Sequence, residues 1–391
     1  MMDVPLTITA LLKHIADNHP EQKLISRTDG AIVRSTYGEF AARVAKLANA
    51  LVKLGVKPGD RVASFGFNTN RHLELYYAVP CVGAVLHTVN IRLFPEQLAF
   101  VMNHVEDELV FADASQMGAL ERTAAVCPQV TRRYVMMGAG ATSLPNVLEY
   151  ETLIAGESDR FAWPEIDERS AAIICHTSAT TGEPKAVVFS HRSIIVHAMM
   201  TGLPDVFGFR MVDVAMPVVP MFHVMAWGIP YSAPMAGSAL VMPGQAMDPK
   251  SLLELISGEG VTFAAGVPTV WLGVRDELKR TGTGLAALER VLIGGSAIPG
   301  GLYDDLVAHG ISVIHGWGMT ELSPLGTTSR PKSAFAQLSL EEQRAKLLKQ
   351  GIFKFPVQHK LLDANGAEVP HDGKTFGELW VRGETIAAGY Y

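Results

Sequence analysis

The chain has 391 residues, of which 48% are hydrophobic and 18% are charged, and its formal net charge is -6. This length and composition exclude a single small module and a disordered chain, and they predict a globular protein with extensive buried surface. The acidic balance argues against a nucleic-acid-binding protein, because no excess of basic residues is present to neutralise phosphates. Three scattered cysteines favour a reducing compartment over a disulfide framework. The sequence shows neither a signal peptide nor an apolar run of membrane-spanning length, so we expect a cytoplasmic protein.

The first clear element is an amphipathic helix. Thr36 and Glu39 have the spacing of a capping box, in which each side chain binds the backbone N–H of the other residue. Apolar residues then recur at helical spacing until Gly55 ends the run: Phe40, Val44, Leu47, Leu51 and Leu54. We therefore expect a helix that covers one face of a sheet.

Strand patterns and helical patterns alternate along most of the remaining chain. Strands are predicted within residues 61–67, 109–113, 171–177, 213–219, 238–243, 261–266, 290–295 and 311–316. Helical patterns lie between some of these strands, at 73–86, after His191 and from Pro249 to Ile256. Such alternation indicates mainly parallel sheet covered by helices on both faces, which is an α/β fold.

The pattern changes toward antiparallel β structure near the C-terminus. Residues 339–351 predict a helix that has a capping serine at its start and a glycine at its end. Beyond it, residues 357–370 and 377–383 are typical of hairpin strands around the turn at Asn365-Gly366. The approximate subdomains that we expect are residues 1–170, 171–338 and a β-rich 351–391.

One loop carries the first sign of chemistry. The segment HTSATTGEPKAVVFSH, residues 176–191, places hydroxyls, a glycine and a lysine between two apolar strands: Thr177, Ser178, Thr180, Thr181, Gly182 and Lys185. Hydroxyl and amide groups with one ammonium can surround phosphate oxygens, although the Walker spacing is absent. On composition alone a solvated turn rich in Ser and Thr fits equally well.

Four further segments give the loop a family context. The loop resembles the TSGTTGxPKG signature of the adenylate-forming superfamily, and PMFHVMAW (220–227), VLIGGSAIP (291–299), HGWGMTELSP (315–324) and GELWVRG (377–383) follow in that family's order. The pattern is most similar to the medium-chain fatty acyl-CoA ligases and the methylmercaptopropionate-CoA ligases. The resemblance implies the large domain of such an enzyme, with two helix-covered, mostly parallel sheets and a distorted antiparallel β-barrel.

The resemblance also implies a reaction and its co-substrates. These enzymes join a carboxylate to the α-phosphate of ATP, release pyrophosphate, and pass the acyl group from AMP to coenzyme A. Thr177, Ser178, Thr180, Thr181 and Lys185 would hold the β and γ phosphates, Thr320 would donate to a phosphate oxygen, and Glu321 would hold Mg²⁺. Superfamily analogy further implies a homodimer.

The remaining matched residues would form the adenine slot and the acid pocket. The walls of the adenine slot would be Gly294, Gly295, Ser296, His315, Gly316 and Trp317. His223 and Trp227 are four residues apart, which is one turn if the segment is helical, so both could face one cavity. The other predicted pocket residues are Met221, Met225, Gly318, Leu322 and Pro324. Glycine at 318, where acetyl-CoA synthetases carry a bulky tryptophan, implies room for a medium-chain or methylthio acid.

Some features depart from the family pattern. Ala179 and Ala186 replace family glycines, and alanine is strained if either position needs a positive φ. The family's ribose-binding aspartate, its hinge and its small C-terminal lid domain would lie beyond Tyr391, so we expect a chain of weak activity by itself. Two alternatives stay open: a catalytically impaired module that binds acyl-adenylates or nucleotides, and an adenylating enzyme whose acyl acceptor is a carrier protein.

Overall fold

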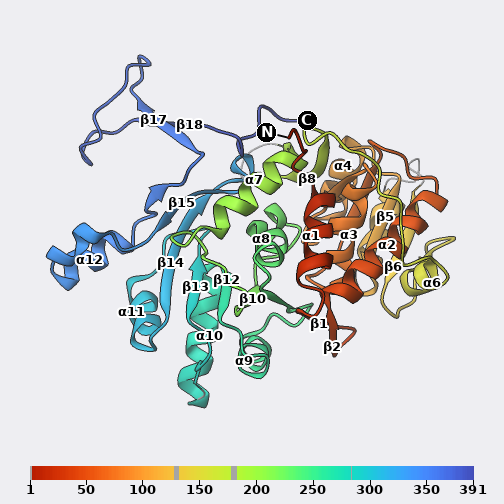
Figure 1. Ribbon diagram of the computed structural model, residues 1–391, viewed down its shortest axis with the longest axis horizontal. Coiled ribbons are helices and arrows are strands. Elements are labelled where there is room, and N and C mark those ends of the chain that lie inside the picture. Colours follow the sequence, from red (N-terminus) through yellow and green to blue (C-terminus); the bar gives the residue numbers. More distant parts are fainter. Residues whose placement is uncertain (1, 127–131, 178–182, 283) are drawn as a thin grey trace.

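A computed structural model describes residues 2–126, 132–177, 183–282 and 284–391. Two large sheets form the framework, and helices lie between them and on their outer faces (Figure 1). The α/β class expected from the sequence is confirmed. In the described part of the chain, no helix is both long enough and apolar enough to cross a membrane.

The first sheet has seven strands in the order β7-β6-β5-β3-β4-β8-β9. All neighbouring strands are parallel except β8 and β9, which form an antiparallel pair. Its strands are β3 (Arg61–Phe65), β4 (Val85–Thr88), β5 (Leu109–Asp113), β6 (Arg133–Met137), β7 (Leu148–Glu149), β8 (Ala171–His176) and β9 (Ala186–Ser190). Strand β5 is buried along its whole length, which explains its continuous apolar sequence.

The second sheet has nine strands in the order β16-β15-β14-β13-β12-β10-β11-β1-β2. It is parallel from β14 to β1, whereas β2, β15 and β16 are antiparallel to their neighbours. Its strands are β1 (Lys23–Thr28), β2 (Ala31–Thr36), β10 (Val214–Pro217), β11 (Ala239–Met242), β12 (Phe263–Gly266), β13 (Arg290–Ile293), β14 (Ser312–Gly318), β15 (Leu325–Ser329) and β16 (Ile352–Phe353).

Among the described residues, helices divide most of the hydrophobic core into an inner part and two outer parts. One core joins both sheets and is filled by α1 (Ile8–Asn18), α2 (Tyr37–Lys53), α3 (Asn70–Cys81), α6 (Tyr150–Ala155), α7 (His191–Gly202) and α8 (Ile229–Met235). The outer face of the first sheet packs on α4 (Pro95–His104) and α5 (Met117–Val126). The outer face of the second sheet packs on α9 (Pro249–Gly258), α10 (Pro268–Thr281) and α11 (Gly300–Ala308). The shared inner core fixes the two sheets relative to each other.

The predicted capping box of α2 is present, and the helix with the predicted capping serine begins with a capping box as well. Thr36 Oγ1 accepts from the Glu39 N–H, and a carboxylate oxygen of Glu39 accepts from the Thr36 N–H, at the start of α2. Ser339 and Glu342 make the same pair of bonds at the start of α12 (Leu340–Leu347).

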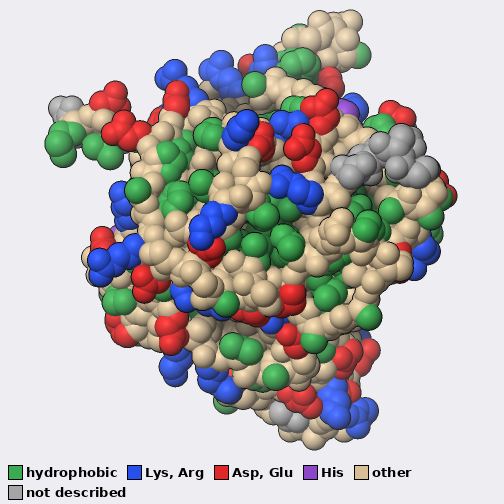
Figure 2. All heavy atoms as spheres, turned by 90° about the vertical axis from the view of Figure 1, so that its right-hand side faces the viewer, with side chains coloured by type: hydrophobic (Ala, Val, Ile, Leu, Met, Phe, Trp, Pro, Cys, Tyr) green, Lys and Arg blue, Asp and Glu red, His purple; other side chains and the backbone are tan. Residues whose placement is uncertain are grey.

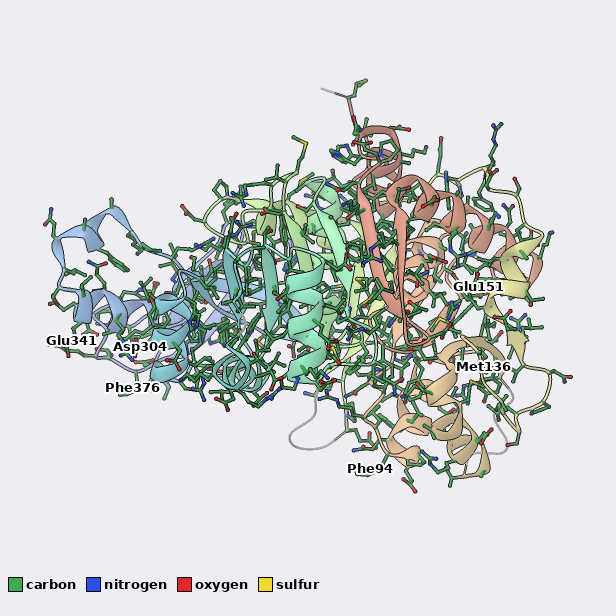
Figure 3. The ribbon with its side chains drawn as sticks, turned by 90° about the horizontal axis from the view of Figure 1, so that it is seen from below. Phe94, Met136, Glu151, Asp304, Glu341 and Phe376 are labelled. Carbon is green, nitrogen blue, oxygen red and sulfur yellow. The ribbon has the colours of Figure 1, made fainter. Side chains whose placement is uncertain are left out.

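The C-terminal region differs from its prediction in two ways. The described residues contain no closed barrel: β16 joins the second sheet, and β17 (Gln358–Leu362) pairs only with β18 (Glu378–Arg382). The Asn365-Gly366 turn gives an isolated bridge between Leu362 and Glu368, so the loop from β17 to β18 is longer than a hairpin turn. Seen from below, Phe376 and Glu341 mark one end of the molecule, while Met136 and Glu151 lie at the other (Figure 3).

Sheet membership crosses the expected subdomain boundaries. Strands β1 and β2, near the N-terminus, complete the second sheet, and β8 and β9 complete the first. These sheets do not test the division at residues 170 and 338, which stays a prediction.

The face formed by the first sheet and its helices carries acidic and basic side chains side by side (Figure 2).

Candidate active site

A cleft of about 460 Å³ lies at the carboxyl ends of strands from both sheets. Its lining follows β8, β10, β13 and β14, and ligands of α/β proteins commonly bind at such strand ends. Of the residues predicted from the sequence, the cleft brings together Thr177, Lys185, His223, Trp227, Gly294, Gly295, Gly316, Trp317, Gly318, Thr320, Glu321 and Pro324. Segments that are far apart in the sequence therefore meet in one recess.

Thr177 and Lys185 are the described ends of the predicted phosphate loop. The Thr177 N–H donates to the Lys185 carbonyl oxygen at 2.9 Å, and the Lys185 N–H donates to Thr177 Oγ1 at 3.2 Å. These bonds extend the antiparallel β8–β9 pair to the mouth of the loop. The other predicted phosphate ligands, Ser178, Thr180, Thr181 and Gly182, lie outside the described residues.

Ala186 is accommodated without the backbone strain that its replacement of glycine could have caused. It lies in extended strand β9, its φ is not positive, and it is fully buried. Its methyl group belongs to a small core with Val85, Val105 and Ile174. Alanine therefore fits this position, whereas Ala179 lies outside the described part of the chain.

Glu321 and Lys185 are connected through a residue that sequence reasoning missed. The Tyr390 hydroxyl donates to Glu321 Oε1 at 2.7 Å, and Lys185 Nζ lies 4.7 Å from the centroid of the Tyr390 ring. The hydrogen bond and charge of Glu321 raise the pKa of Tyr390. No periodic or motif signal marks Tyr390 in the sequence, because only the folded chain brings it beside β9.

Glycines allow the ends of β13 and β14 to approach each other. A Cβ on Gly294 would lie 2.9 Å from the Gly316 carbonyl oxygen and 3.2 Å from the Trp227 ring, which is closer than packing permits. The Trp317 ring makes an edge-to-face contact with Phe353, with the centroids 6.1 Å apart. This part of the wall is thus defined by backbone and aromatic surface.

Two residues predicted for the adenine slot are not among those that line the cleft. Ser296 is exposed beyond the cleft wall. His315 is buried in β14, where its Nδ1–H donates to the Leu348 carbonyl oxygen at 2.8 Å. Burial lowers the pKa of His315, so the ring is neutral at pH 7.

His223 and Trp227 line the same cleft, but not because the segment is an ordinary helix. Residues 224–227 all have positive φ, between 42° and 57°, and form a left-handed turn that ends at Gly228 with φ of 77°. Such a run is costly for residues with side chains and persists only where the surroundings impose it. His223 opens into the cleft, and its recessed position lowers its pKa.

The apolar wall differs from the one predicted. Met221, Met225 and Leu322 are buried in the core and do not line the cleft. Three other apolar residues line it instead: Val224 and Leu325, which are close to them in sequence, and Leu292 of β13. The motifs therefore located the wall correctly, but the face of each segment depends on local backbone conformation that periodicity does not reveal.

Gly318 has a role that the sequence did not reveal. A Cβ at this position would overlap the Pro324 carbonyl oxygen, which accepts from the Met319 N–H at 3.0 Å. The expectation that glycine simply leaves space for substrate is incomplete, because the backbone contact itself excludes any side chain pointing in that direction.

A smaller cavity of about 240 Å³ meets the cleft at Thr177 and His223, which line both spaces. His87 and His176 form part of its wall. His87 Nδ1 lies 2.6 Å from Asp107 Oδ2, and His87 Nε2 lies 2.9 Å from His176 Nδ1. Burial lowers the pKa of His176 to about 3, so this ring is neutral at pH 7.

Comparisons with known proteins agree with this arrangement. The family model described as AMP-binding enzyme matches residues 12–391. The 3-methylmercaptopropionyl-CoA ligase of Ruegeria lacuscaerulensis is 42% identical over 100% of this chain and 74% of its own length. The medium-chain-fatty-acid–CoA ligase of Ectopseudomonas oleovorans is 41% identical over 100% of this chain and 72% of its own length.

A solved structure shows the same fold. An anthranilate CoA ligase in complex with anthranoyl-AMP superposes with a TM-score of 0.86 at 20% identity, covering 99% of this chain and 72% of that chain. The likeness at this identity concerns the fold alone. The sequence relatives and the family match together show that the chain belongs to the family of AMP-binding enzymes.

Proposed function

We propose that this chain is an AMP-forming acyl-CoA ligase. It activates a small to medium-chain carboxylic acid with ATP, releases pyrophosphate, and transfers the acyl group from acyl-AMP to coenzyme A. The observation that carries the proposal is a single cleft that has both a charged wall and an apolar wall. The charged wall contains Lys185 and Glu321, and the apolar wall contains Val224, Leu292 and Leu325. Such a cleft suits a polyanion and an aliphatic acid together.

The polar part of the cleft would bind ATP. Thr177 and Lys185, together with Ser178, Thr180, Thr181 and Gly182, would hold the β and γ phosphates, because an ammonium and several hydroxyls neutralise and orient phosphate oxygens. Gly294, Gly295, Gly316 and Trp317 would flank the adenine. Neutralisation is essential to this reaction, because a carboxylate must approach a polyanion.

Glu321 fits a magnesium ion. Its Oε1 accepts from Tyr390, which leaves Oε2 able to contact a cation, and Thr320 lies next to it in the same lining. Carboxylate oxygen and substrate phosphates are the ligands that Mg²⁺ prefers. The bound ion would supply positive charge near the α-phosphate.

The other part of the cleft would bind the acid. His223 would border the carboxylate as a largely neutral donor, since its pKa is lowered. Trp227, Pro324 and the three apolar residues of the wall suit an aliphatic or methylthio chain better than an amino acid. The two ligases named above, which act on methylthio and medium-chain acids by name, support this choice.

Coenzyme A would need a second approach to the acyl group. The smaller cavity meets the cleft at Thr177 and His223, so a thiol could reach the acyl-adenylate without displacing AMP. This second opening supports a reaction with coenzyme A over a module that only binds acyl-adenylates or nucleotides.

A homodimer and a cytoplasmic location are also part of the proposal. Family resemblance supports the homodimer, and the sequence supports the location. Sedimentation equilibrium tests the homodimer, and cell fractionation tests the location.

The proposal is tested by following pyrophosphate exchange and thioester formation with ATP, Mg²⁺ and a panel of acids. We expect exchange with 3-(methylthio)propionate, butyrate or octanoate and little with phenylalanine, and thioester formation when coenzyme A is added. Thioester formation on a carrier protein but not on coenzyme A would favour the other acceptor. Binding of acyl-AMP without any exchange would favour the catalytically impaired module.

A further inference from the structure

A second large cavity, of about 480 Å³, lies away from the cleft; we call it the switch-point cavity. It is lined by residues that follow β3, β5 and β6 in the first sheet, and by the turn between β1 and β2 in the second. No described residue lines both this cavity and the cleft. Its occupant would therefore not compete with ATP or with the acid.

The strand order places this cavity at a topological switch point. From β3 the chain passes to β4 on one side, and from β4 it crosses to β5 on the other side of β3. The connection after β3 thus runs to one side, whereas the connection after β5 runs to β6 on the other side, which opens a crevice between the carboxyl ends of β3 and β5. Ligands of open α/β sheets bind in crevices of this kind.

Two arginines, Arg27 and Arg71, line the cavity together with the carboxyl groups of Asp29 and Asp113. The Arg27 guanidinium donates to the carbonyl oxygens of Ala246 and Ser251, at 3.4 and 3.2 Å, and its nearest carboxylate oxygen, on exposed Glu254, is 3.9 Å away. Carbonyl groups fix this cation without neutralising it.

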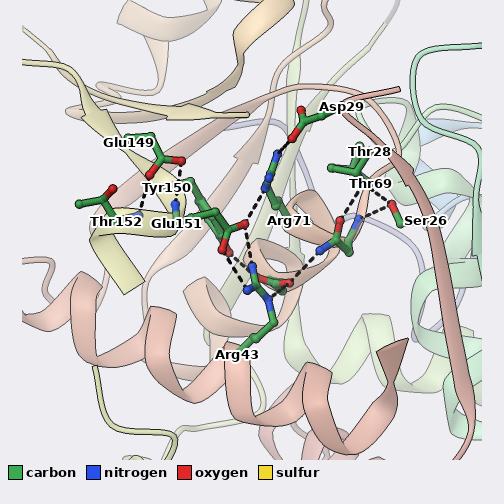
Figure 4. A network of polar contacts seen from close by, with 12 residues as sticks. Ser26, Thr28, Asp29, Arg43, Thr69, Arg71, Glu149, Tyr150, Glu151 and Thr152 are labelled. Carbon is green, nitrogen blue, oxygen red and sulfur yellow. Dashed lines mark hydrogen bonds and ion pairs between the residues drawn. The ribbon is translucent and has the colours of Figure 1, made fainter. Parts of the chain in front are cut away.

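Arg71 is held on the same cavity by a wider network (Figure 4). Its Nη1 donates to Asp29 at 2.9 Å and its Nε donates to Glu151 at 2.8 Å. Arg71 also lies in the first turn of α3, whose positive end and capping residue Thr69 face the cavity. The side chain is fixed before any ligand arrives, which reduces the entropy lost on binding.

Asp113 supplies an acceptor in the lining of the same cavity. This side chain is 9% exposed, and its Oδ2 accepts from the Phe67 N–H at 2.6 Å. Its Oδ1 accepts no hydrogen bond among the described residues, although the residue lines the cavity. Burial raises the pKa of Asp113 to about 7, so the carboxyl group has lost stabilisation by water that a ligand donor could restore.

Glycines make room for these charged groups. A Cβ on Gly66 would lie 2.8 Å from Asp113 Oδ2, and one on Gly138, whose φ is 104°, would overlap Asp29. Larger residues at either position would displace a group that lines or supports the cavity. The positions of these charged side chains thus depend on glycine in the neighbouring backbone.

We propose that the switch-point cavity binds a small phosphate monoester that carries free hydroxyl groups, such as a sugar phosphate. The phosphate lies toward Arg27, Arg71 and the start of α3, and a hydroxyl group donates to Asp113 Oδ1. Inorganic phosphate lacks the hydroxyl contact and a neutral sugar lacks the charge, so each binds more weakly. The site goes beyond the proposed ligase reaction and does not depend on it.

Isothermal titration calorimetry with ribose 5-phosphate tests this site. The cleft is first saturated with a non-hydrolysable acyl-AMP analogue, whose own titration reports separately on the proposed function. Ribose 5-phosphate should bind one site per chain, and ribose or inorganic phosphate should bind at least about tenfold more weakly, a difference of about 1.4 kcal/mol. If the analogue does not bind, the titration proceeds on the free chain and still reports on the second site.

Variants locate the binding. R27Q and D113N should each weaken ribose 5-phosphate binding by about tenfold or more, while R34Q, which changes an arginine of β2 outside the cavity, should leave it unchanged. Circular dichroism verifies folding, and R27Q decides the outcome if D113N fails to fold. Absence of saturable binding to the folded wild-type chain would overturn the proposal. Displacement by the acyl-AMP analogue, or unchanged binding by R27Q, would overturn it as well.

Discussion

Among the described residues, Glu321 is held by the hydroxyl of Tyr390 and forms no ion pair with a cationic side chain. Because Oε1 already accepts a hydrogen bond at 2.7 Å, only part of the carboxylate is committed within the protein. We expect Glu321→Gln to keep the side-chain shape and the Tyr390 contact but to lose the negative charge. Activity with ATP should fall by roughly 100-fold, and more Mg²⁺ should be required, as measured by pyrophosphate exchange at varied Mg²⁺.

Tyr390→Phe is the matched control for this change. It keeps the ring beside Lys185 and removes only the hydroxyl that contacts Glu321. We expect a much smaller loss of activity and little change in the Mg²⁺ requirement. An equal Mg²⁺ dependence in Glu321→Gln and in the wild type would contradict the role proposed for Glu321.

Buried histidines make stability depend on pH. Burial lowers the pKa of His197 to about 3 and that of His72 to about 4, whereas both titrate near about 6.5 in the unfolded chain. Below about pH 6.5 the unfolded state therefore binds more protons than the folded state. The free energy of unfolding should be highest above this pH and should fall as the pH decreases toward about 4.

His197→Gln tests this effect at one site. His197 Nε2 accepts from the Leu325 N–H at 3.3 Å, and a glutamine carbonyl oxygen can replace that acceptor without titrating. Urea unfolding between pH 7 and pH 5 should show a shallower pH dependence in the variant, by about 2 kcal/mol over this range. The same dependence in both proteins would mean that His197 contributes nothing to it.

At the scale of single elements, the approach of β14 to the turn after it constrains the cleft wall. At Gly318 the backbone lies so close to Pro324 that a Cβ would overlap the Pro324 carbonyl oxygen. Gly318→Ala should therefore cost roughly 2 kcal/mol or more of stability, besides any effect on the acid that binds. Thermal unfolding and urea unfolding measure the cost.

Gly301→Ala provides a control in α11, where a Cβ would meet nothing within 4 Å. This variant should stay within about 1 kcal/mol of the wild type or gain stability, because alanine favours helix. If Gly318→Ala is as stable as Gly301→Ala and changes only the preferred acid, glycine at 318 serves the substrate alone and the packing account is wrong.

Elements with strong local signals could be predicted, whereas their partners could not. The apolar run of β5 and the capping box of α2 identify themselves within a few residues. The placement of β1 and β2 in the second sheet depends on contacts with β11, more than 200 residues away in sequence. No local pattern encodes such a pairing.

The candidate site shows the same limit. The motifs located most of the cleft because the residues of one motif lie next to each other at the end of one strand. Gly316, Trp317 and Gly318 at the end of β14 are an example. The left-handed turn at 224–227 reverses which side chains face the cleft, so Val224 lines it and Met225 does not. Tyr390 comes from a distant segment that reaches the site only through the fold.

At the scale of the whole molecule, both sheets and their shared core act as one support for the cleft. The inner core contains Val62 and Phe111 of the first sheet as well as Phe263 and Leu292 of the second. Residues from the two sheets therefore face each other across the cleft at fixed separation. Binding of one ligand that bridges both should stabilise the whole chain, since ligand bound to the folded state shifts the unfolding equilibrium.

Thermal unfolding with Mg²⁺ and non-hydrolysable acyl-AMP analogues tests the central claim most directly. The acyl group is varied from about two to ten carbons, and the unfolding temperature is followed as a function of analogue concentration. We predict stabilisation that rises with concentration and is greatest at an intermediate chain length. The absence of a shift with every analogue, in a chain that unfolds cooperatively, would contradict acyl-adenylate binding in this cleft.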